Sequence, residues 1–263
     1  MKVLITGGYG FLGSHLYESL KTTKHEIVRF RSREFNLSSY SETELLFREF
    51  KPDVVYHLAA RLGGIGDNRK NPAAYFEQNM RIGLNVFKAA QVFNVRRVIN
   101  VGTVCSYPKF SPIPFVEENV WLGFPEETNS AYGIAKRALF SYAKALESQG
   151  KLKFTNILMA NLYGPGDDFR EQTSHVIPAL IKKIYWSMEN GLDSIDVWGD
   201  GSPTRDFLFV KDAAKILHLF LEIDNIAADT PINLGTGMET RISSVVNNLS
   251  SQIGFNGGIL FNH

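Results

Sequence analysis

The sequence predicts an α/β protein whose core is a doubly wound parallel sheet of the Rossmann type. Short apolar runs rich in β-branched residues alternate with helical patterns from the amino terminus to Met159, an order typical of parallel sheets. The first run, Lys2–Thr6, leads directly into the glycine-rich segment Gly7–Gly13 and then into a helical pattern. A smaller carboxyl-terminal lobe is expected to follow, because the α/β alternation breaks down after Asn161.

Length and composition limit the possible functions. The chain has 263 residues, of which 44% are hydrophobic, and this is enough for one large core or two joined lobes. A formal net charge of +1 gives no electrostatic reason to expect nucleic acid or an anionic membrane as a partner. One cysteine, Cys105, excludes an intrachain disulfide, and no apolar run approaches the length of a membrane span. We therefore expect a cytoplasmic protein without a bound metal.

The segment after the first strand has the spacing of a dinucleotide-binding loop. The first glycine permits a tight turn, the second lets the backbone approach a pyrophosphate, and the third allows the helix and strand to pack closely. Free N–H groups at the start of the following helix then face the phosphates. The cofactor-binding residues predicted on this loop are Gly7, Tyr9, Gly10, Phe11, Leu12 and Gly13.

Arginines at the end of the second expected strand, Glu26–Phe30, favour NADP over NAD. An NAD-selective site usually carries an acidic residue here, which binds the ribose 2′-hydroxyl. This sequence instead continues with Arg31 and Arg33, and guanidinium groups suit a 2′-phosphate. The alternative is that these arginines form only a solvated strand end.

The remaining elements follow from hydrophobic periodicity. Helices are expected at Ser41–Phe50, Pro72–Asn94, Ser130–Ser148, Val176–Met188 and near Ile242–Ile253. A further helix is expected to follow Val210 and to run through Leu221. Strands are expected at Asp53–Ala60, Val98–Val101, Phe154–Met159, Ile195–Trp198, Phe207–Val210 and Ile232–Leu234. We assign residues 1–165 and roughly 206–236 to the cofactor domain, and roughly 166–205 and 237–263 to the substrate lobe.

Three of these segments carry further expectations. Ala59 and Ala60 are small enough to let a cofactor lie close to the end of their strand, and Arg61–Gly66 should form a flexible loop beside it. Gly102 and the polar residues after it should face the ligand crevice at the carboxyl ends of the strands. The Pro72–Asn94 helix is apolar around much of its circumference, which predicts burial on more than one side, as in a homodimer.

A phenol and an ammonium group stand four residues apart in the Ser130–Ser148 helix. Positions i and i+4 lie on one helix face, so Tyr132 and Lys136 can address the same small volume. A neighbouring cation is expected to lower the pKa of the phenol and ease proton transfer. By itself the spacing favours a half-buried tyrosine beside a solvated lysine, and only the other motifs reverse this preference.

Together these motifs resemble the extended short-chain dehydrogenase/reductases, and within them the GDP-L-fucose synthases. The resemblance extends over nearly the whole chain, in segments that occur in the same order as in that family. These segments are Ala60–Ile65, Gln78–Met80, Val104–Lys109, Ala160–Pro165, Ser174–Leu180 and Val197–Gly199. The resemblance implies an NADP-dependent epimerase/reductase that acts on a GDP-4-keto-6-deoxy-hexose and forms a homodimer.

The resemblance also implies roles for individual residues. Thr103, Tyr132 and Lys136 would form the reduction triad, and Cys105 with His175 would be the acid and base that invert the carbons beside the ketone. Such groups suit the chemistry, because a ketone acidifies the adjacent C–H bonds. The further residues implied at the cofactor are Gly102, Lys136, Asn161 and His175, and those implied at the substrate are Asn161, Lys183, Trp198 and Arg205.

Several alternatives remain open at this stage. Cys105 could be a small buried hydrophobe, His175 a helix cap, and Trp198 a core residue. A 4-epimerase needs only the Thr, Tyr and Lys, while a related GDP-sugar reductase or 3,5-epimerase would act on another keto-sugar. From a different class, the chain could be a non-catalytic NADP-binding regulator. The chain also ends at Phe261–His263, before the closing segment of the family, so we expect NADPH to bind well and the GDP-sugar poorly.

Overall fold

The computed structural model describes residues 1–63, 65–150, 152–170, 173–223 and 230–262. Within these ranges the main sheet has six strands in the order β10-β5-β4-β3-β1-β2, and all its neighbours pair in parallel. The strands are β1 (Lys2–Thr6), β2 (Glu26–Arg29), β3 (Val54–His57), β4 (Arg97–Thr103), β5 (Lys153–Met159) and β10 (Ile232–Leu234). The chain runs outward in both directions from β1, which confirms the Rossmann-type fold.

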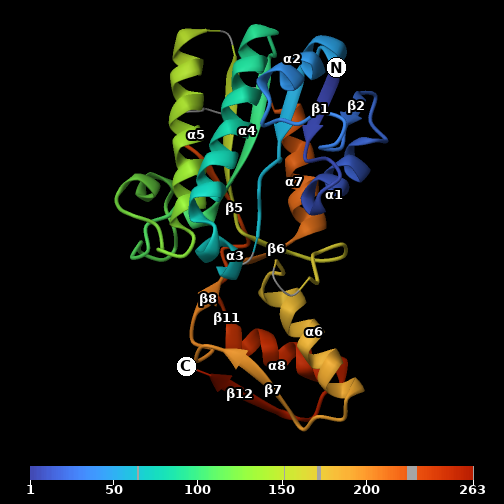
Figure 1. The fold of residues 1–263 in the computed structure, drawn as a ribbon, viewed down its shortest axis with the longest axis vertical. Helices are drawn as coiled ribbons and strands as arrows, with labels where there is room; N and C mark the ends of the chain where they lie inside the picture. The colour runs from blue at the N-terminus through green and yellow to red at the C-terminus, as the bar shows by residue number, and fades with distance from the viewer. Residues whose placement is uncertain (64, 151, 171–172, 224–229, 263) are drawn as a thin grey trace.

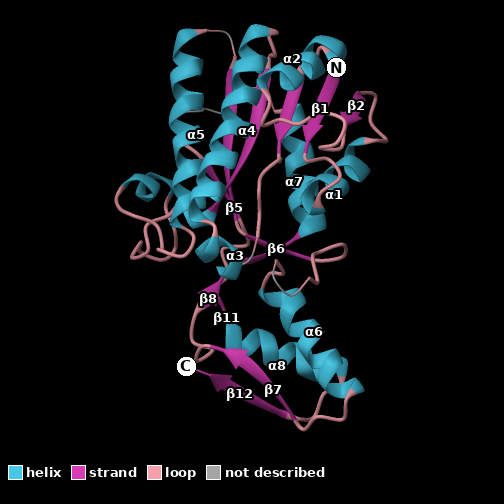
Figure 2. Cartoon of the chain, in the orientation of Figure 1, coloured by secondary structure: helices cyan, strands magenta, loops and turns pink. Residues whose placement is uncertain are grey.

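Helices cover both faces of this sheet, as Figures 1 and 2 show. The helices are α1 (Phe11–Leu20), α2 (Tyr40–Phe50), α4 (Pro72–Val92), α5 (Ser130–Gln149) and α7 (Val210–Glu222). Buried leucines of α1 and α7 pack with one face of the strands, whereas α2, α4 and α5 pack against the other. Strands that are buried on both faces read as continuous apolar runs, which explains why the sequence pattern located them.

A second group of elements, which we call the carboxyl-terminal part, lies below the main sheet in Figure 1. Its elements are α6 (Val176–Glu189), β7 (Ser194–Trp198), α8 (Ile242–Ile253) and β12 (Gly258–Asn262), and β12 pairs in parallel with β7. They share a separate core that includes Leu180, Ile184, Val197 and Val246. Two short ladders lie between this part and the main sheet: β6 (Asn161–Tyr163) with β9 (Phe207–Phe209), and β8 (Thr204–Arg205) with β11 (Thr240–Arg241).

Three differences from the sequence-based expectation concern the loop after β3, the end of β3 and the last strand. The expected loop Arg61–Gly66 is wrong at its end, because Ile65 and Gly66 begin the short helix α3 (Ile65–Lys70), while Gly64 lies outside the described residues. Strand β3 ends at His57 rather than Ala60, since the Ala59 N–H leaves the ladder and donates to Thr6 Oγ1 at 3.2 Å.

The third difference is strand β12, which the sequence pattern did not identify. It has a glycine at its start and only three consecutive apolar residues, so its local signal is weak and the strand depends on pairing with β7. None of the described helices is both long and apolar enough to cross a membrane.

Candidate active site

The glycine-rich loop closes tightly over the carboxyl end of β1. Gly7 has a φ of +68°, a conformation that L side chains rarely adopt, and a Cβ there would lie 2.9 Å from the Ala59 nitrogen. A Cβ on Gly13 would lie 2.2 Å from the Gly7 oxygen, so a side chain would push α1 away from the loop. Helix α1 begins at Phe11, directly after Gly10, whose N–H donates to the Gly7 carbonyl at 2.9 Å. The loop thus presents backbone at the position where a pyrophosphate would bind.

Beside this loop, two guanidinium groups pack on one tyrosine ring. The Arg29 guanidinium carbon is 4.2 Å from the centre of the Tyr9 ring, and that of Arg31 is 4.1 Å away. Arg29 also lies over the Tyr17 ring at 3.6 Å and donates to the Gly8 carbonyl at 3.3 Å. Bringing two like charges together is unfavourable unless an anion offsets it, so this cluster suits a phosphate group.

Of the arginines expected at this position, the structure places Arg31 in the cluster and Arg33 in an exposed turn that follows it. Sequence reasoning missed Arg29. The strand period contained the signal, because residues 29 and 31 are two apart and therefore project to the same side of an extended chain.

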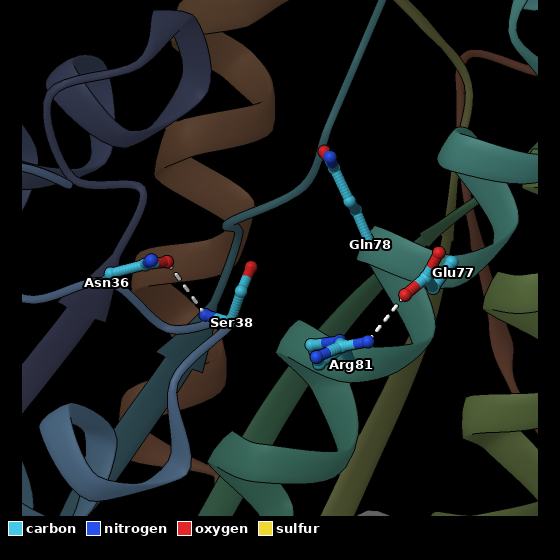
Figure 3. Close-up of a pocket in the computed structure, with 5 residues that line it drawn as sticks. All are labelled: Asn36, Ser38, Glu77, Gln78 and Arg81. Carbon is cyan, nitrogen blue, oxygen red and sulfur yellow. Dashed lines mark hydrogen bonds and ion pairs between the residues drawn. The ribbon is translucent and has the colours of Figure 1, made fainter.

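A pocket of about 480 Å³ opens between α4 and the segment that follows β2. It is lined by Asn36, Ser38, Glu77, Gln78 and Arg81 (Figure 3). The Arg81 guanidinium pairs with the Glu77 carboxylate one helical turn away. Figure 3 shows the Gln78 amide directed away from that ion pair, which leaves it free to contact a bound group.

Lys136 is buried at the carboxyl end of β4. Its ammonium group donates to the Val101 carbonyl at 3.0 Å, and its residue is only 2% exposed. Burial lowers the pKa of Lys136 to about 8. Behind it lies buried His57, which contacts Thr6 Oγ1 through Nδ1 at 3.0 Å. Burial and the nearby Lys136 charge hold the pKa of His57 well below its ordinary value, so His57 is a neutral neighbour.

The phenol of Tyr132 differs from the sequence-based expectation. Burial raises its pKa above the ordinary value of 10.0, and the neighbouring Cys105 raises it further. The expectation that Lys136 lowers this pKa is therefore wrong for the structure described, because burial and Cys105 both raise it while the Lys136 ammonium is bound to a backbone carbonyl. Tyr132 keeps its proton at neutral pH and can act as a proton donor.

Thr103 and Cys105 face the start of α5 from the end of β4. The Cys105 N–H donates to Thr103 Oγ1 at 3.1 Å, and a Cβ on Gly133 would lie 2.3 Å from the Cys105 oxygen. This close approach of the backbones brings Cys105 beside Tyr132. Gly102, the preceding residue, is equally crowded, because a Cβ there would lie 2.3 Å from the Phe140 ring. Thr103, Cys105, Tyr132 and Lys136 therefore belong to one site.

Charged residues reach the Cys105 thiol from two other segments. Burial raises the thiol pKa, whereas a bond to Thr103 and the charge of Arg205 lower it. The charge of Glu126 acts in the other direction and raises the thiol pKa. Its carboxylate also accepts from the Thr128 N–H at 3.1 Å, which holds it in the loop before α5. Sequence reasoning placed Arg205 at the substrate but missed Glu126, which has no motif of its own and reaches the site through the fold of its loop.

The other implied substrate residues lie in the carboxyl-terminal part. Trp198, at the end of β7, is 82% exposed and is therefore not a core residue. The Lys183 ammonium lies 5.2 Å from the centre of the Trp198 ring and donates to the Asp196 carbonyl at 2.9 Å. An exposed indole with an adjacent cation can bind a flat, anionic group such as a nucleotide.

The loop between β6 and α6 contributes His175, the residue before the first turn of α6. Its side chain makes no capping hydrogen bond, and its Nδ1 lies 3.5 Å from Asp167 Oδ1. Asn161, at the start of β6, donates through its amide to the Asp206 carbonyl at 3.1 Å. This bond fixes the amide near the ladder between the two parts of the chain.

Comparison with known proteins agrees with this geometry. Residues 3–235 match the NAD dependent epimerase/dehydratase family over most of the chain. The chain belongs to this family. As a member of it, the chain is 32% identical over 268 residues to the GDP-L-fucose synthase of Escherichia coli K12, which covers 99% of this chain and 84% of that protein. It is 31% identical over 265 residues to the GDP-L-colitose synthase of Yersinia pseudotuberculosis, covering 99% and 85% respectively.

Solved structures of other family members superpose closely. A GDP-L-fucose synthetase from Naegleria fowleri bound to NADP has a TM-score of 0.90 and 28% identity, covering 99% of this chain and 80% of that one. A GDP-mannoheptose C4 reductase from Campylobacter jejuni with NADP bound has a TM-score of 0.89 and 25% identity, covering 99% and 88%. The family resemblance expected from the sequence is therefore confirmed.

Proposed function

We propose that the protein is an NADPH-dependent epimerase/reductase of a GDP-linked 4-keto-6-deoxy-hexose. The observation that carries this proposal is the position of the Cys105 thiol beside the Tyr132 phenol, on the helix that also carries the buried Lys136. A plain 4-epimerase or 4-reductase needs the phenol but not a thiol. A regulator that only binds a cofactor needs neither group.

The site's own residues fit NADPH. The Gly7–Gly13 loop would hold the pyrophosphate, and the Arg29–Tyr9–Arg31 cluster would bind the 2′-phosphate. The pocket beside Gln78 would take the adenine end, since amide groups on its walls complement the edge of a base. The neighbouring structure with bound NADP supports the same choice of cofactor.

The proposed chemistry uses two sets of groups. For epimerisation, Cys105 and His175 would remove and return a proton at the carbons beside the ketone, while Tyr132 and Thr103 stabilise the enolate oxygen. NADPH supplies a hydride to C4 when bound. Tyr132 would then donate its proton to the C4 oxygen, a role that fits a phenol whose pKa is raised. The Lys136 ammonium would orient the cofactor ribose and replenish this proton.

Substrate recognition is assigned to the carboxyl-terminal part. Trp198 would stack on guanine, while Lys183 and Arg205 would meet the diphosphate. Relatives named for GDP-L-fucose and GDP-L-colitose support a GDP-linked sugar. We accordingly propose that residues 1–165 with about 206–236 bind the cofactor and that about 166–205 with 237–263 bind the sugar nucleotide.

Turnover in heavy water tests this proposal. The protein is incubated with GDP-4-keto-6-deoxymannose, first alone and then with NADPH, and the sugar is analysed by mass spectrometry and NMR. We expect deuterium at the carbons flanking the ketone in both samples, and a reduced, epimerised sugar only with NADPH. Reduction without deuterium incorporation would instead make the protein a C4 reductase. Absence of both reactions with this sugar would contradict the proposal.

We also propose a homodimer. Phe76 and Leu84 form an apolar stripe on α4, about two turns apart along the helix and about 80° apart around it, and they are 40% and 38% exposed. Apolar side chains in such a stripe would be buried against a second copy. Light scattering at micromolar concentration should give twice the mass of 29.5 kDa. A monomer under these conditions would refute the dimer without affecting the proposed chemistry.

A further inference from the structure

His175 lies beside the carboxylate of Asp167, a residue with no role in the chemistry proposed above. Its Nδ1 lies 3.5 Å from Asp167 Oδ1, and the two side chains are 51% and 4% exposed respectively. One edge of the imidazole therefore faces a buried carboxylate. The His175 side chain is half exposed, so the imidazole can also contact a ligand.

The Asp167 carboxylate lacks enough partners of its own. Oδ1 accepts from the Asp168 N–H at 2.8 Å, and buried Oδ2 has no hydrogen-bond partner among the described residues. A buried carboxylate is costly unless a donor or a cation offsets its charge. The imidazole of His175 is the ionisable group placed to do so, because a protonated Nδ1 would donate to this carboxylate.

The neighbouring carboxylate, that of Asp168, cannot replace Asp167. Arg170 donates to it at 2.8 Å, and the Thr173 hydroxyl donates at 2.5 Å. These contacts hold the pKa of Asp168 well below its ordinary range. Two adjacent aspartates thus have separate tasks: one holds the loop together, and the other faces the histidine.

The position of Asp167 is also linked to the cofactor-binding helix. The Asp167 N–H donates to the Gly164 carbonyl at 3.3 Å and closes a turn. His15 on α1 contacts the Pro165 carbonyl through Nε2 at 2.8 Å. The turn that carries Asp167 therefore contacts the helix that follows the glycine-rich loop.

We propose that Asp167 is the positioning residue for His175: it keeps Nδ1 protonated, so that Nε2 is the atom that exchanges protons with the carbon beside the ketone. In the forward step Nε2 takes the proton, and the C–H electron pair moves into the ketone to form an enolate. The imidazolium keeps its Nδ1–H toward Asp167. In the reverse sense Nε2–H returns the proton, and the enolate pair re-forms the C–H bond. This inference rests on the proposed function of His175.

Nitrogen NMR of the free protein tests the tautomer without any substrate. The protein is labelled with ¹⁵N-histidine, and His175→Asn identifies the signals of His175. We expect neutral His175 to be protonated on Nδ1 in the wild type and to shift toward the Nε2–H form in Asp167→Asn, whose amide can donate to Nδ1. Asp168→Asn is the matched control and should leave the tautomer unchanged. A wild-type His175 protonated on Nε2 would overturn the inference, whatever happens to the variants.

Deuterium exchange then tests the consequence for the reaction. Asp167→Asn should slow incorporation of solvent deuterium into GDP-4-keto-6-deoxymannose by on the order of 10²-fold or more, as expected when an acid–base group holds the wrong tautomer. Direct reduction of the ketone by NADPH should change much less, and Asp168→Asn should leave both rates near wild type. Exchange at the wild-type rate in Asp167→Asn would refute the inference. A protein with the expected tautomer but no turnover would refute only the proposed substrate.

Discussion

The two ends of the proposed site are built in different ways. The reduction centre lies on regular elements of the main sheet, where Lys136 is 2% exposed and the backbone of Cys105 packs directly on Gly133. The proposed nucleotide-sugar end lies on short strands of the carboxyl-terminal part, where Trp198 is 82% exposed. Burial and close packing fix the protonation state and position of a side chain before any ligand binds. An exposed side chain such as Trp198 becomes packed only when a ligand binds against it. Variants at the two ends should therefore fail in different ways.

The largest effect is expected at the phenol. Tyr132→Phe keeps the ring but removes the proton donor, so reduction should fall by roughly 10²–10⁴-fold. Binding of NADPH and of the GDP-sugar should change little. Tyr142→Phe, on the same helix, is the control and should reduce at the wild-type rate. Stopped-flow measurement of NADPH oxidation distinguishes the two, and a Tyr132→Phe variant with wild-type reduction would show that another group donates the proton.

Lys136→Met should lose activity but gain stability. Because burial lowers the pKa of Lys136 to about 8 from 10.5, the unfolded chain holds this proton more tightly than the folded protein does. The buried charge therefore costs stability below about pH 8, and the cost shrinks as the pH rises toward 10.5. At pH 7 the free energy of unfolding of Lys136→Met should exceed that of the wild type by on the order of 1–2 kcal/mol. This figure allows for the lost hydrogen bond to the Val101 carbonyl.

Chemical denaturation at pH 7 and at pH 10 measures this effect. The difference between Lys136→Met and wild type should narrow at the higher pH. Exposed Lys144, on the same helix, provides the control, since Lys144→Met should change neither stability nor activity much. An unstable Lys136→Met variant at pH 7 would mean that its bond to the Val101 carbonyl outweighs the cost of burial.

An intermediate effect is expected in the arginine cluster. Replacing both Arg29 and Arg31 with Ala should weaken NADPH binding, because each charge-assisted phosphate contact contributes roughly 1.5–3 kcal/mol. Affinity for NADH should stay nearly constant. Titration of NADPH and NADH against the wild type, the double variant and Arg33→Ala shows how much each set of arginines contributes to NADPH affinity. Equal loss in Arg33→Ala would favour the exposed turn over the Tyr9 cluster as the phosphate site.

The smallest effect is expected at the exposed indole. Trp198→Ala should raise the KM for the GDP-sugar about tenfold, near the lower end of the roughly 1–3 kcal/mol measured for base stacking, and leave kcat nearly unchanged. NADPH binding should be unaffected. Trp186, which is 57% exposed on α6, provides a matched control. Steady-state kinetics with both substrates varied separates the effect on KM from the effect on kcat. A fall in kcat would show that Trp198 contributes to the chemical step and not only to substrate binding.

Local sequence signals were sufficient for the main sheet and its loop. Lys2–Thr6, the glycine spacing and the four-residue step from Tyr132 to Lys136 each report on backbone periodicity, which neighbouring residues alone determine. The same is true of helix α4, whose bounds differ from the expected Pro72–Asn94 by only two residues at its end. For these elements the type and approximate bounds were predicted from the sequence, and the structure adds the distances between their residues.

Tertiary structure decided which side chains meet and in what protonation state. The pKa of Tyr132 rises through burial, which depends on how β4, α5 and the Cys105 turn pack together, and no spacing rule reports this. Glu126 reaches the thiol from a loop, and Asp167 reaches His175 across a turn, both without a motif. Strand β12 exists because β7 offers it an edge. Local sequence patterns therefore predicted the fold and the candidate reacting groups, whereas the solvation and partners of these groups follow from long-range packing, because both depend on residues far apart in the chain.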